Sequence, residues 1–150
     1  MTTKVDLESA LKDAIRSHNE PAKRTIRMVL TSIKLMEIEK GQPLDEAAIA
    51  SVLQKEMKIR QESITDAQKA NRLDLISSND EELEILKSFL PAQLSEDELK
   101  ELAIRIIQEI GATGPADIGR VMKIIIPQIQ GRAAGDQINR VVRELLVSGA

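Results

Sequence analysis

The chain reads Leu90-Pro91-Ala92-Gln93-Leu94-Ser95-Glu96-Asp97-Glu98 across residues 90–98, and this stretch decides its organisation. Pro91 stops a helix that arrives from the N-terminal side, because it lacks a backbone N–H and disfavours helix at the residue before it. Ser95 and Glu98 have the spacing of a capping box, which starts a new helix. We therefore predict a domain boundary here, between residues 1–92 and residues 93–150.

Downstream of the boundary, apolar residues keep helical spacing in three segments. Gly111 is the predicted C-terminal cap of the first, and Gly131 and Gly135 bracket a loop before the third. Pro127 lies inside the second, where its missing N–H predicts either a kink or an end followed by a restart. The three stripes are Leu99, Leu102, Ala103, Ile106, Ile107 and Ile110; Ile118, Val121, Met122, Ile125 and Ile129; and Ile138, Val141, Val142, Leu145 and Leu146. They predict a compact three-helix domain.

Upstream of the boundary, the same periodicity predicts about four helices. They fall at about residues 7–18, 21–40, 46–67 and 80–89. Asp45 is the predicted N-cap of the third, and Asn79 with Glu82 has the capping-box form that would start the fourth. The segment 73–76 is either a separate short turn or the tail of the third helix. The apolar residues off the main stripe of the second helix predict neighbours on two of its sides; they are Met28, Leu35 and Ile38.

These patterns together predict an all-α protein, an N-terminal helical region of about four helices followed by a compact three-helix C-terminal domain. No apolar run approaches the roughly 18 residues of a membrane span, so we expect no membrane partner. The first residues lack the apolar stretch of a secretory signal, and we expect a cytoplasmic location.

Composition narrows the chemistry. The 150 residues include no Cys and a single His, His18, so we expect no metal site and no cofactor. Phe89 is the sole aromatic residue, which excludes the stacking platforms of single-strand RNA binders. The net charge is −3, so a basic surface has to be local.

Four groups of residues allow both a functional and a structural interpretation. His18 is a general base or a polar residue at a helix end. The acidic run at residues 80–84 is a metal or acid/base site, or a solvated helix start. Lys23, Arg27 and Lys34 form a basic strip that is functional or merely solvated. The loop 131–136 has the geometry that receives phosphate, or it is a turn whose helix is capped by Asp136. No catalytic residue is assigned.

Several motifs in this chain resemble those of the GatB/YqeY family, in its stand-alone YqeY-like form. They are Leu86–Ser95, Asp117–Lys123, Pro127, Gly131–Ala133, Asn139 and Val142. In that family the same helical unit also forms the C-terminal tail of the B subunit of the glutamine-dependent aspartyl/glutamyl-tRNA amidotransferase. The resemblance implies a helical region followed by a three-helix domain, and a tail that meets the outer corner of tRNA. The catalytic centres of the amidotransferase lie in other domains and subunits.

Residues 112–150 carry five cations and three carboxylates, a net charge of +2 within an acidic chain. The cations are the candidate nucleic-acid-binding residues: Arg120, Lys123, Arg132, Arg140 and Arg143. The first three match basic positions of the family. Family members often have Lys where this chain has Gln128 and Gln130. They also commonly have Lys after the second loop glycine, where this chain has Asp136.

The leading hypothesis is a non-catalytic tRNA-binding accessory protein related to the transamidation machinery of translation. The main alternative is a protein-interaction module that docks on an amidotransferase or an aminoacyl-tRNA synthetase. A third, a carbon–nitrogen ligase in its own right, rests on family association alone.

Overall fold

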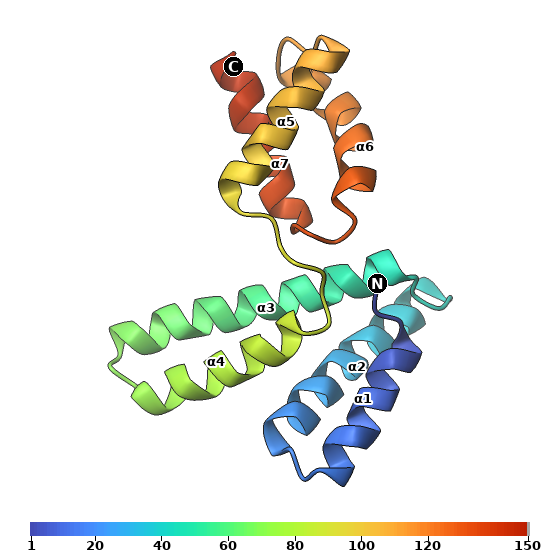
Figure 1. Ribbon diagram of the computed structural model, residues 1–150, viewed down its shortest axis with the longest axis vertical. Helices are drawn as coiled ribbons and strands as arrows, with labels where there is room; N and C mark the ends of the chain where they lie inside the picture. The colour runs from blue at the N-terminus through green and yellow to red at the C-terminus, as the bar shows by residue number, and fades with distance from the viewer. Residues whose placement is uncertain (150) are drawn as a thin grey trace. The chain divides into compact units, whose positions relative to one another are not determined.

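The computed structural model describes residues 1–149 of the chain. Within this range the protein forms seven α-helices and one short 3-10 helix, and it contains no strand. The prediction of an all-α fold is confirmed. The chain divides into two compact units, one comprising Met1–Pro91 and one beginning at Ala92 (Figure 1).

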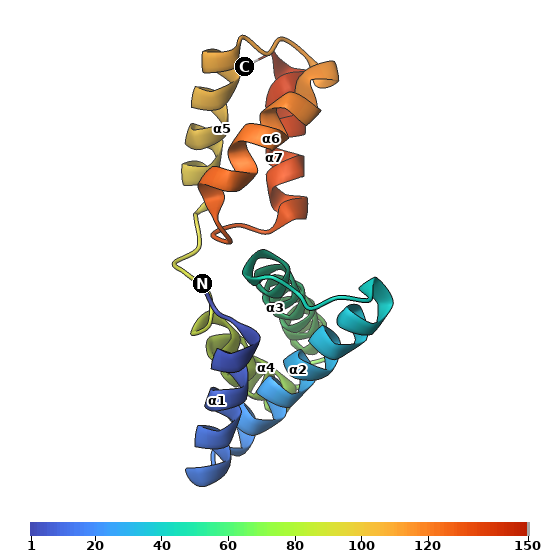
Figure 2. The same ribbon diagram turned by 90° about the vertical axis from the view of Figure 1, so that its right-hand side faces the viewer.

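The first unit consists of four helices arranged as two hairpins. Their bounds are α1 Lys4–Arg16, α2 Glu20–Lys40, α3 Glu46–Lys69 and α4 Leu73–Lys87. Helix α1 packs on α2, and α3 packs along α4 (Figures 1 and 2). Helix α2 also contacts both α3 and α4, so it is the central helix that joins the hairpins.

Local side-chain chemistry sets the ends of these helices. Thr3 and Asp6 form a capping box at the start of α1, and Asn19 accepts a hydrogen bond from the Ala22 amide at the start of α2. Asp45 caps α3 as predicted, accepting from the Ala48 amide at 2.8 Å. Gly41 ends α2 in the left-handed region, with φ 70°, which a residue with a Cβ rarely adopts.

Two clusters of apolar side chains fill the first unit. The larger cluster comprises Leu7, Val29, Ile33, Ile49, Val52, Leu53, Met57, Leu83 and Leu86. The smaller one comprises Ala14, Ala22 and Ile26 from α1 and α2. Phe89 packs against both clusters, and its carbonyl accepts a hydrogen bond from the Thr2 hydroxyl. The sole aromatic residue therefore joins the two parts of the core.

A buried ionic network crosses α2, α3 and α4. The Arg60 side chain on α3 is only 3% exposed, and it bonds the carboxylate of Glu56 one turn earlier. Its Nε donates to Glu82 Oε2 on α4 at 3.1 Å. Glu82 also accepts from Arg24 on α2 at 3.0 Å, and Ser32 on α2 donates to Glu56. Two cations and two carboxylates balance, which is the condition for keeping charges in a protein interior.

Helix α4 begins at Leu73, seven residues before the predicted start. The prediction that Asn79 and Glu82 form a capping box is therefore wrong. The Asn79 side chain donates to the Leu75 carbonyl at 2.8 Å, inside the helix, and Glu82 joins the buried network. The segment 73–76, for which the sequence allowed either a separate turn or the tail of the third helix, is instead the first turn of α4. Asn71 makes the turn from α3 at φ 55°, a conformation that Asn tolerates well.

Of the three apolar residues off the main stripe of α2, Met28 has a neighbour on another helix, because its sulfur accepts a hydrogen bond from Arg60 on α3, whereas Leu35 and Ile38 lack the predicted cover within the described chain. Leu35 is 62% exposed, Ile38 is 68% exposed and Met28 is 46% exposed. Leu35 and Ile38 are exposed because they lie off the buried face of α2, which carries Ala22, Ile26, Val29 and Ile33.

The second unit is a three-helix bundle. Its helices are α5 Glu96–Ile110, α6 Ile118–Ile129 and α7 Gly135–Ser148, with a 3-10 turn η1 Pro115–Asp117 before α6. Each helix contacts the other two (Figure 2). Its buried core is Leu99, Ala103, Ile106, Ile107, Val121, Ile125, Ile129, Ala133, Ile138, Val141, Val142 and Leu146. The predicted caps at Ser95 with Glu98 and at Gly111 are confirmed.

The segment that enters the second unit is held by hydrogen bonds to the loop between α6 and α7. The Leu94 amide donates to the Arg132 carbonyl at 2.7 Å. The Arg132 Nε donates back to the Ala92 carbonyl at 2.9 Å, and the Gln93 side-chain Nε2 donates to the Gly131 carbonyl at 3.1 Å. Residues 92–94 therefore belong to this unit.

Pro127 does not interrupt α6, which runs unbroken to Ile129. Its missing N–H leaves the Lys123 carbonyl without the usual helical donor, and the helix ends two residues later. Gln130 then adopts φ 48° and Gly131 φ 79°, so two consecutive left-handed residues turn the chain toward α7.

We expect Arg60→Met to lower the free energy of unfolding by about 3–5 kcal/mol. The substitution keeps an unbranched side chain but leaves Glu56 and Glu82 without the buried cation between them. Guanidinium unfolding followed by circular dichroism measures the change. The control is Arg105→Met, which removes an exposed cation from α5 and should change stability by no more than about 0.5 kcal/mol. Equal stability of the two variants would contradict the structural importance of the network.

Candidate nucleic-acid interface

The five predicted contact residues all lie on the outer surface of the second unit, in three places. Arg120 and Lys123 are on α6, Arg132 is in the loop after it, and Arg140 and Arg143 are on α7. All five side chains are exposed. They differ in what they bond within the protein.

Arg120 ties the start of α6 to the end of α5. One guanidinium nitrogen donates to Asp117 Oδ1 at 3.0 Å, and the other donates to the carbonyl of Ile110 at 3.2 Å. That carbonyl is at the last turn of α5, where helical acceptors lack partners. Asp117 in turn accepts from the Thr113 amide, and the pKa of its carboxyl is lowered by this bond and then by Arg120.

Arg132 lies at the opposite end of the bundle. Its Nε holds the Ala92 carbonyl, and its side chain lines a hollow of about 350 Å³ with Glu98, Glu101, Arg105 and Gln128. Glu98 belongs to the capping box with Ser95, whose backbone N–H chiefly lowers the pKa of the Glu98 carboxyl, with a smaller contribution from Arg132. The hollow therefore carries both signs of charge.

Arg140 is paired with two carboxylates. It donates to Glu96 Oε1 at the start of α5, at 3.3 Å, and to Glu144 Oε1 one turn along α7, at 3.5 Å. The bond to Arg140 is the main reason that the pKa of Glu96 is lowered. This cation links α7 to α5.

Lys123 and Arg143 stand apart from the other three. Both are exposed, and neither has an ion-pair partner within residues 1–149. Arg105 on α5, which sequence reasoning did not single out, shares this property. The sequence offered no sign of this, because Glu101 and Glu109 lie four residues away on either side and are potential i,i+4 partners, yet neither pairs with Arg105 within residues 1–149.

The five residues do not converge on one point. Arg120 binds the carbonyl of the last residue of α5, and Arg132 binds a carbonyl just before that helix. Fifteen helical residues span about 22 Å, so these two guanidinium groups lie at opposite ends of the bundle. The five cations are therefore spread over the surface of the second unit and do not gather in one pocket of the described chain.

The loop between Gly131 and Gly135 serves the fold. Its carbonyls accept from Gln93 and Leu94, and Asp136 is not the N-cap of α7, contrary to the prediction. Ala134 occupies that position without a side-chain bond, and Asp136 lies in the first turn, where its Oδ1 accepts from the Gln137 amide at 3.0 Å. Helix α7 begins at Gly135, three residues before Ile138, which is its first buried apolar residue.

The remaining groups of residues, His18, the acidic run 80–84 and the basic strip, all lie in the first unit. His18 is exposed at φ 55° in the turn between α1 and α2. The described residues hold no group of three His, Cys, Asp or Glu side chains that could bind a metal ion. Across residues 1–149, no helix combines the length and apolar character needed to cross a membrane.

The fold and this surface define a two-unit, all-helical protein with dispersed cations on a three-helix bundle. The chain belongs to the family of YqeY-like proteins, whose model matches residues 4–146.

Curated relatives in fungi share this chain's sequence over most of its length. A protein of Pyrenophora tritici-repentis named altered inheritance of mitochondria protein 41, mitochondrial, is 28% identical over 93% of this chain and 78% of its own length. A protein of the same name from Clavispora lusitaniae is 33% identical over 79% of this chain and 71% of its own length. A protein of the same name from Lachancea thermotolerans is 34% identical over 74% of this chain and 61% of its own length.

The names of these relatives correct one expectation. All three are named as mitochondrial proteins, which overturns the cytoplasmic location expected from the N-terminal sequence. The physical reason is that a missing apolar signal distinguishes secreted proteins from others but does not separate the cytosol from an organelle.

We expect Asp117→Asn to destabilise the protein near neutral pH and to matter less in acid. The pKa of Asp117 is below its ordinary value of 3.8 in the folded chain, so the ionised carboxylate contributes stability above that value and loses it as the pH falls toward the lower folded-state pKa. Thermal unfolding at pH 7 and at about pH 3 measures the difference between variant and wild type. Asp97→Asn on α5 is the control, and a difference independent of pH would contradict the assignment.

Proposed function

We propose that this protein is a non-catalytic accessory protein that binds folded RNA, and tRNA in particular, through the second unit. The observation that carries the proposal is the pair of exposed cations Lys123 and Arg143, whose charges are not neutralised by an ion pair within the described chain. Free cations can replace the counterions that surround a phosphate backbone, and the release of those counterions drives binding.

The chemistry of the surface agrees with recognition of shape and phosphate. Folded RNA is recognised largely by its backbone, which requires no stacked aromatic side chains. The resemblance to the tail of a tRNA amidotransferase subunit supports tRNA as the RNA. That resemblance concerns a recognition domain, so the proposed role is to assist transamidation without performing it.

Arg120, Arg132 and Arg140 have a secondary role in this proposal. Each already bonds the protein's own carbonyl or carboxylate oxygens. A guanidinium group has five N–H donors, so each retains donors that face solvent and can meet a phosphate oxygen. Their substitution removes hydrogen bonds within the protein as well as surface charge, which makes them poorer probes of binding.

Titration of tRNA with the Lys123→Glu, Arg143→Glu double variant tests the function. We expect wild-type protein to bind tRNA at low salt, and the variant to bind more weakly with a salt dependence reduced by about one unit of slope per lost phosphate contact. Filter binding or fluorescence anisotropy at about 50 and about 200 mM salt measures both quantities.

The matched control is the Lys12→Glu, Lys69→Glu double variant. It changes the net charge by the same amount at two exposed lysines of the first unit that have no ion pair in the described chain. It should bind tRNA nearly as wild type does, apart from a weak effect of net charge. Loss of binding to the same degree in both variants, or no wild-type binding at low salt, would refute the proposal.

The alternative function is docking on another protein, such as an amidotransferase or an aminoacyl-tRNA synthetase. The observation that favours it is an uncovered apolar groove in the first unit, between α2 and α4. Nuclease treatment separates the two functions, because a protein complex survives it and an RNA-bridged complex does not.

A further inference from the structure

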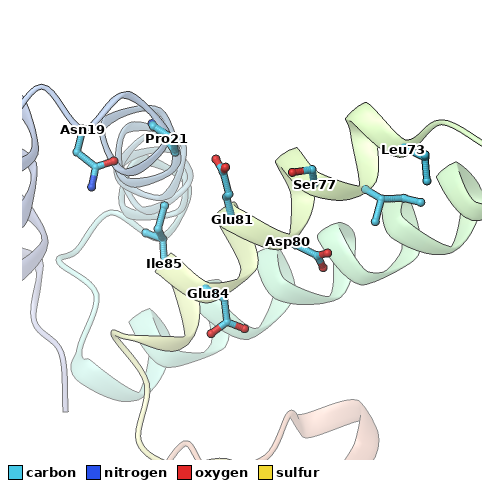
Figure 3. A pocket seen from close by; sticks show the side chains of 9 residues that line it. Asn19, Pro21, Leu73, Ser77, Asp80, Glu81, Glu84 and Ile85 are labelled. Carbon is cyan, nitrogen blue, oxygen red and sulfur yellow. The ribbon is translucent and has the colours of Figure 1, made fainter.

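A groove of about 690 Å³ lies between the start of α2 and the length of α4. Figure 3 shows Pro21 and Ile85 at its α2 end and Leu73 at the other end, on the first turn of α4. The full lining is Asn19, Pro21, Leu73, Ile76, Ser77, Asp80, Glu81, Glu84 and Ile85. All of these residues belong to the first unit.

The apolar side chains in this groove are not required by the core next to it. Leu73 is 72% exposed, and neither Leu73 nor Ile76 belongs to the two apolar clusters of the first unit. Ile85 is half-buried and touches only the edge of the smaller cluster. Exposed leucines that occur singly are common, but here an apolar strip lines a hollow, which is typical of a binding surface.

The sides of the groove are acidic. Asp80, Glu81 and Glu84 line the groove from α4, and Figure 3 shows them along that helix between Leu73 and Ile85. Glu84 is paired with Lys87 at 3.1 Å, whereas Asp80 and Glu81 have no ion-pair partner within residues 1–149. No cation lines the groove. An occupant that balances these charges must be basic.

The groove also has the length of a short helix. Leu73, Ile76, Asp80 and Glu84 follow helical spacing along one side of α4, and the eleven steps from Leu73 to Glu84 rise about 16 Å, or three turns. A partner helix of three turns presents apolar anchors at i, i+3 or i+4, and i+7 along the same distance.

We propose that this groove binds a basic amphipathic helix of another protein. Leucine-type side chains of that helix contact Leu73, Ile76 and Ile85, and its lysines or arginines pair with Asp80 and Glu81. The inference is independent of RNA binding, because it uses only the first unit and the opposite sign of charge.

A designed peptide supplies the probe for this site. It is an 18-residue fluorescent helix with Leu at i, i+3, i+4 and i+7 positions and Lys on the other face, and a second peptide replaces every Lys with Glu. We expect the full-length protein to bind the Lys peptide and not the Glu peptide, as measured by fluorescence anisotropy at physiological salt.

Two variants remove the two kinds of contact separately. Leu73→Asp replaces an exposed apolar side chain, and Asp80→Lys with Glu81→Lys reverses the unpaired charges. Each should weaken binding of the Lys peptide roughly tenfold or more, since the first loses an apolar anchor and the second adds repulsion. Circular dichroism checks that both remain folded.

Matched controls change the same properties elsewhere in the first unit. Leu35→Asp alters another exposed leucine, on α2, and Glu39→Lys with Asp66→Lys reverses two exposed carboxylates outside the groove. Both controls should bind the Lys peptide within about twofold of wild type.

Three results would overturn the proposal. One is binding that falls equally in the charge-reversal variant and its control, which would indicate a general attraction between opposite charges. Another is unchanged binding by Leu73→Asp, because the apolar strip would then take no part. The last is a concentration-dependent dimer in sedimentation that Leu73→Asp converts to monomer, which would make a second copy of this chain the occupant.

Discussion

The first unit depends on the buried guanidinium of Arg60. It contacts Glu56 on its own helix, Glu82 on α4 and the Met28 sulfur on α2, so three helices meet at one planar group with fixed donor directions. Because an unpaired charge in this interior would be costly, the helices can pack only in the register that satisfies it. That register also orients α4. Glu82 faces inward, and residues two positions away on a helix point to nearly the opposite side, so Asp80 and Glu84 line the outer groove.

The second unit uses its cations in a comparable way, but at the surface. Arg120, Arg132 and Arg140 each join segments that are distant in sequence, by bonding a carbonyl or carboxylate on another element. From Ala92 to the end, the chain has seven cations and eight carboxylates, so the unit as a whole is not basic. Binding to a polyanion would therefore depend on individual unpaired cations, chiefly Lys123 and Arg143, and not on the field of the whole unit.

Helix ends were predictable where a few neighbouring residues decide them. The Ser95 capping box, the Asp45 cap and the glycine end at Gly111 all occur as predicted, since each depends on backbone groups within one turn. The start of α4 was not predictable in this way. Ser77, Ser78 and Asn79 are weak helix formers, and only the long packing of α4 against α3 keeps them helical.

The sequence by itself determined the all-helical class, the helical stripes and most of the caps, because periodicity and capping are local properties of the chain. It also placed the candidate cations, but not their partners. Only the tertiary structure decided which charges are buried and balanced, which cations remain unpaired and which apolar residues face solvent. Nothing in the sequence around Arg60, Lys123 or Leu73 distinguishes these residues from the other arginines, lysines and leucines of the chain. Their environments differ because each is created by residues far away along the chain or by the lack of such residues.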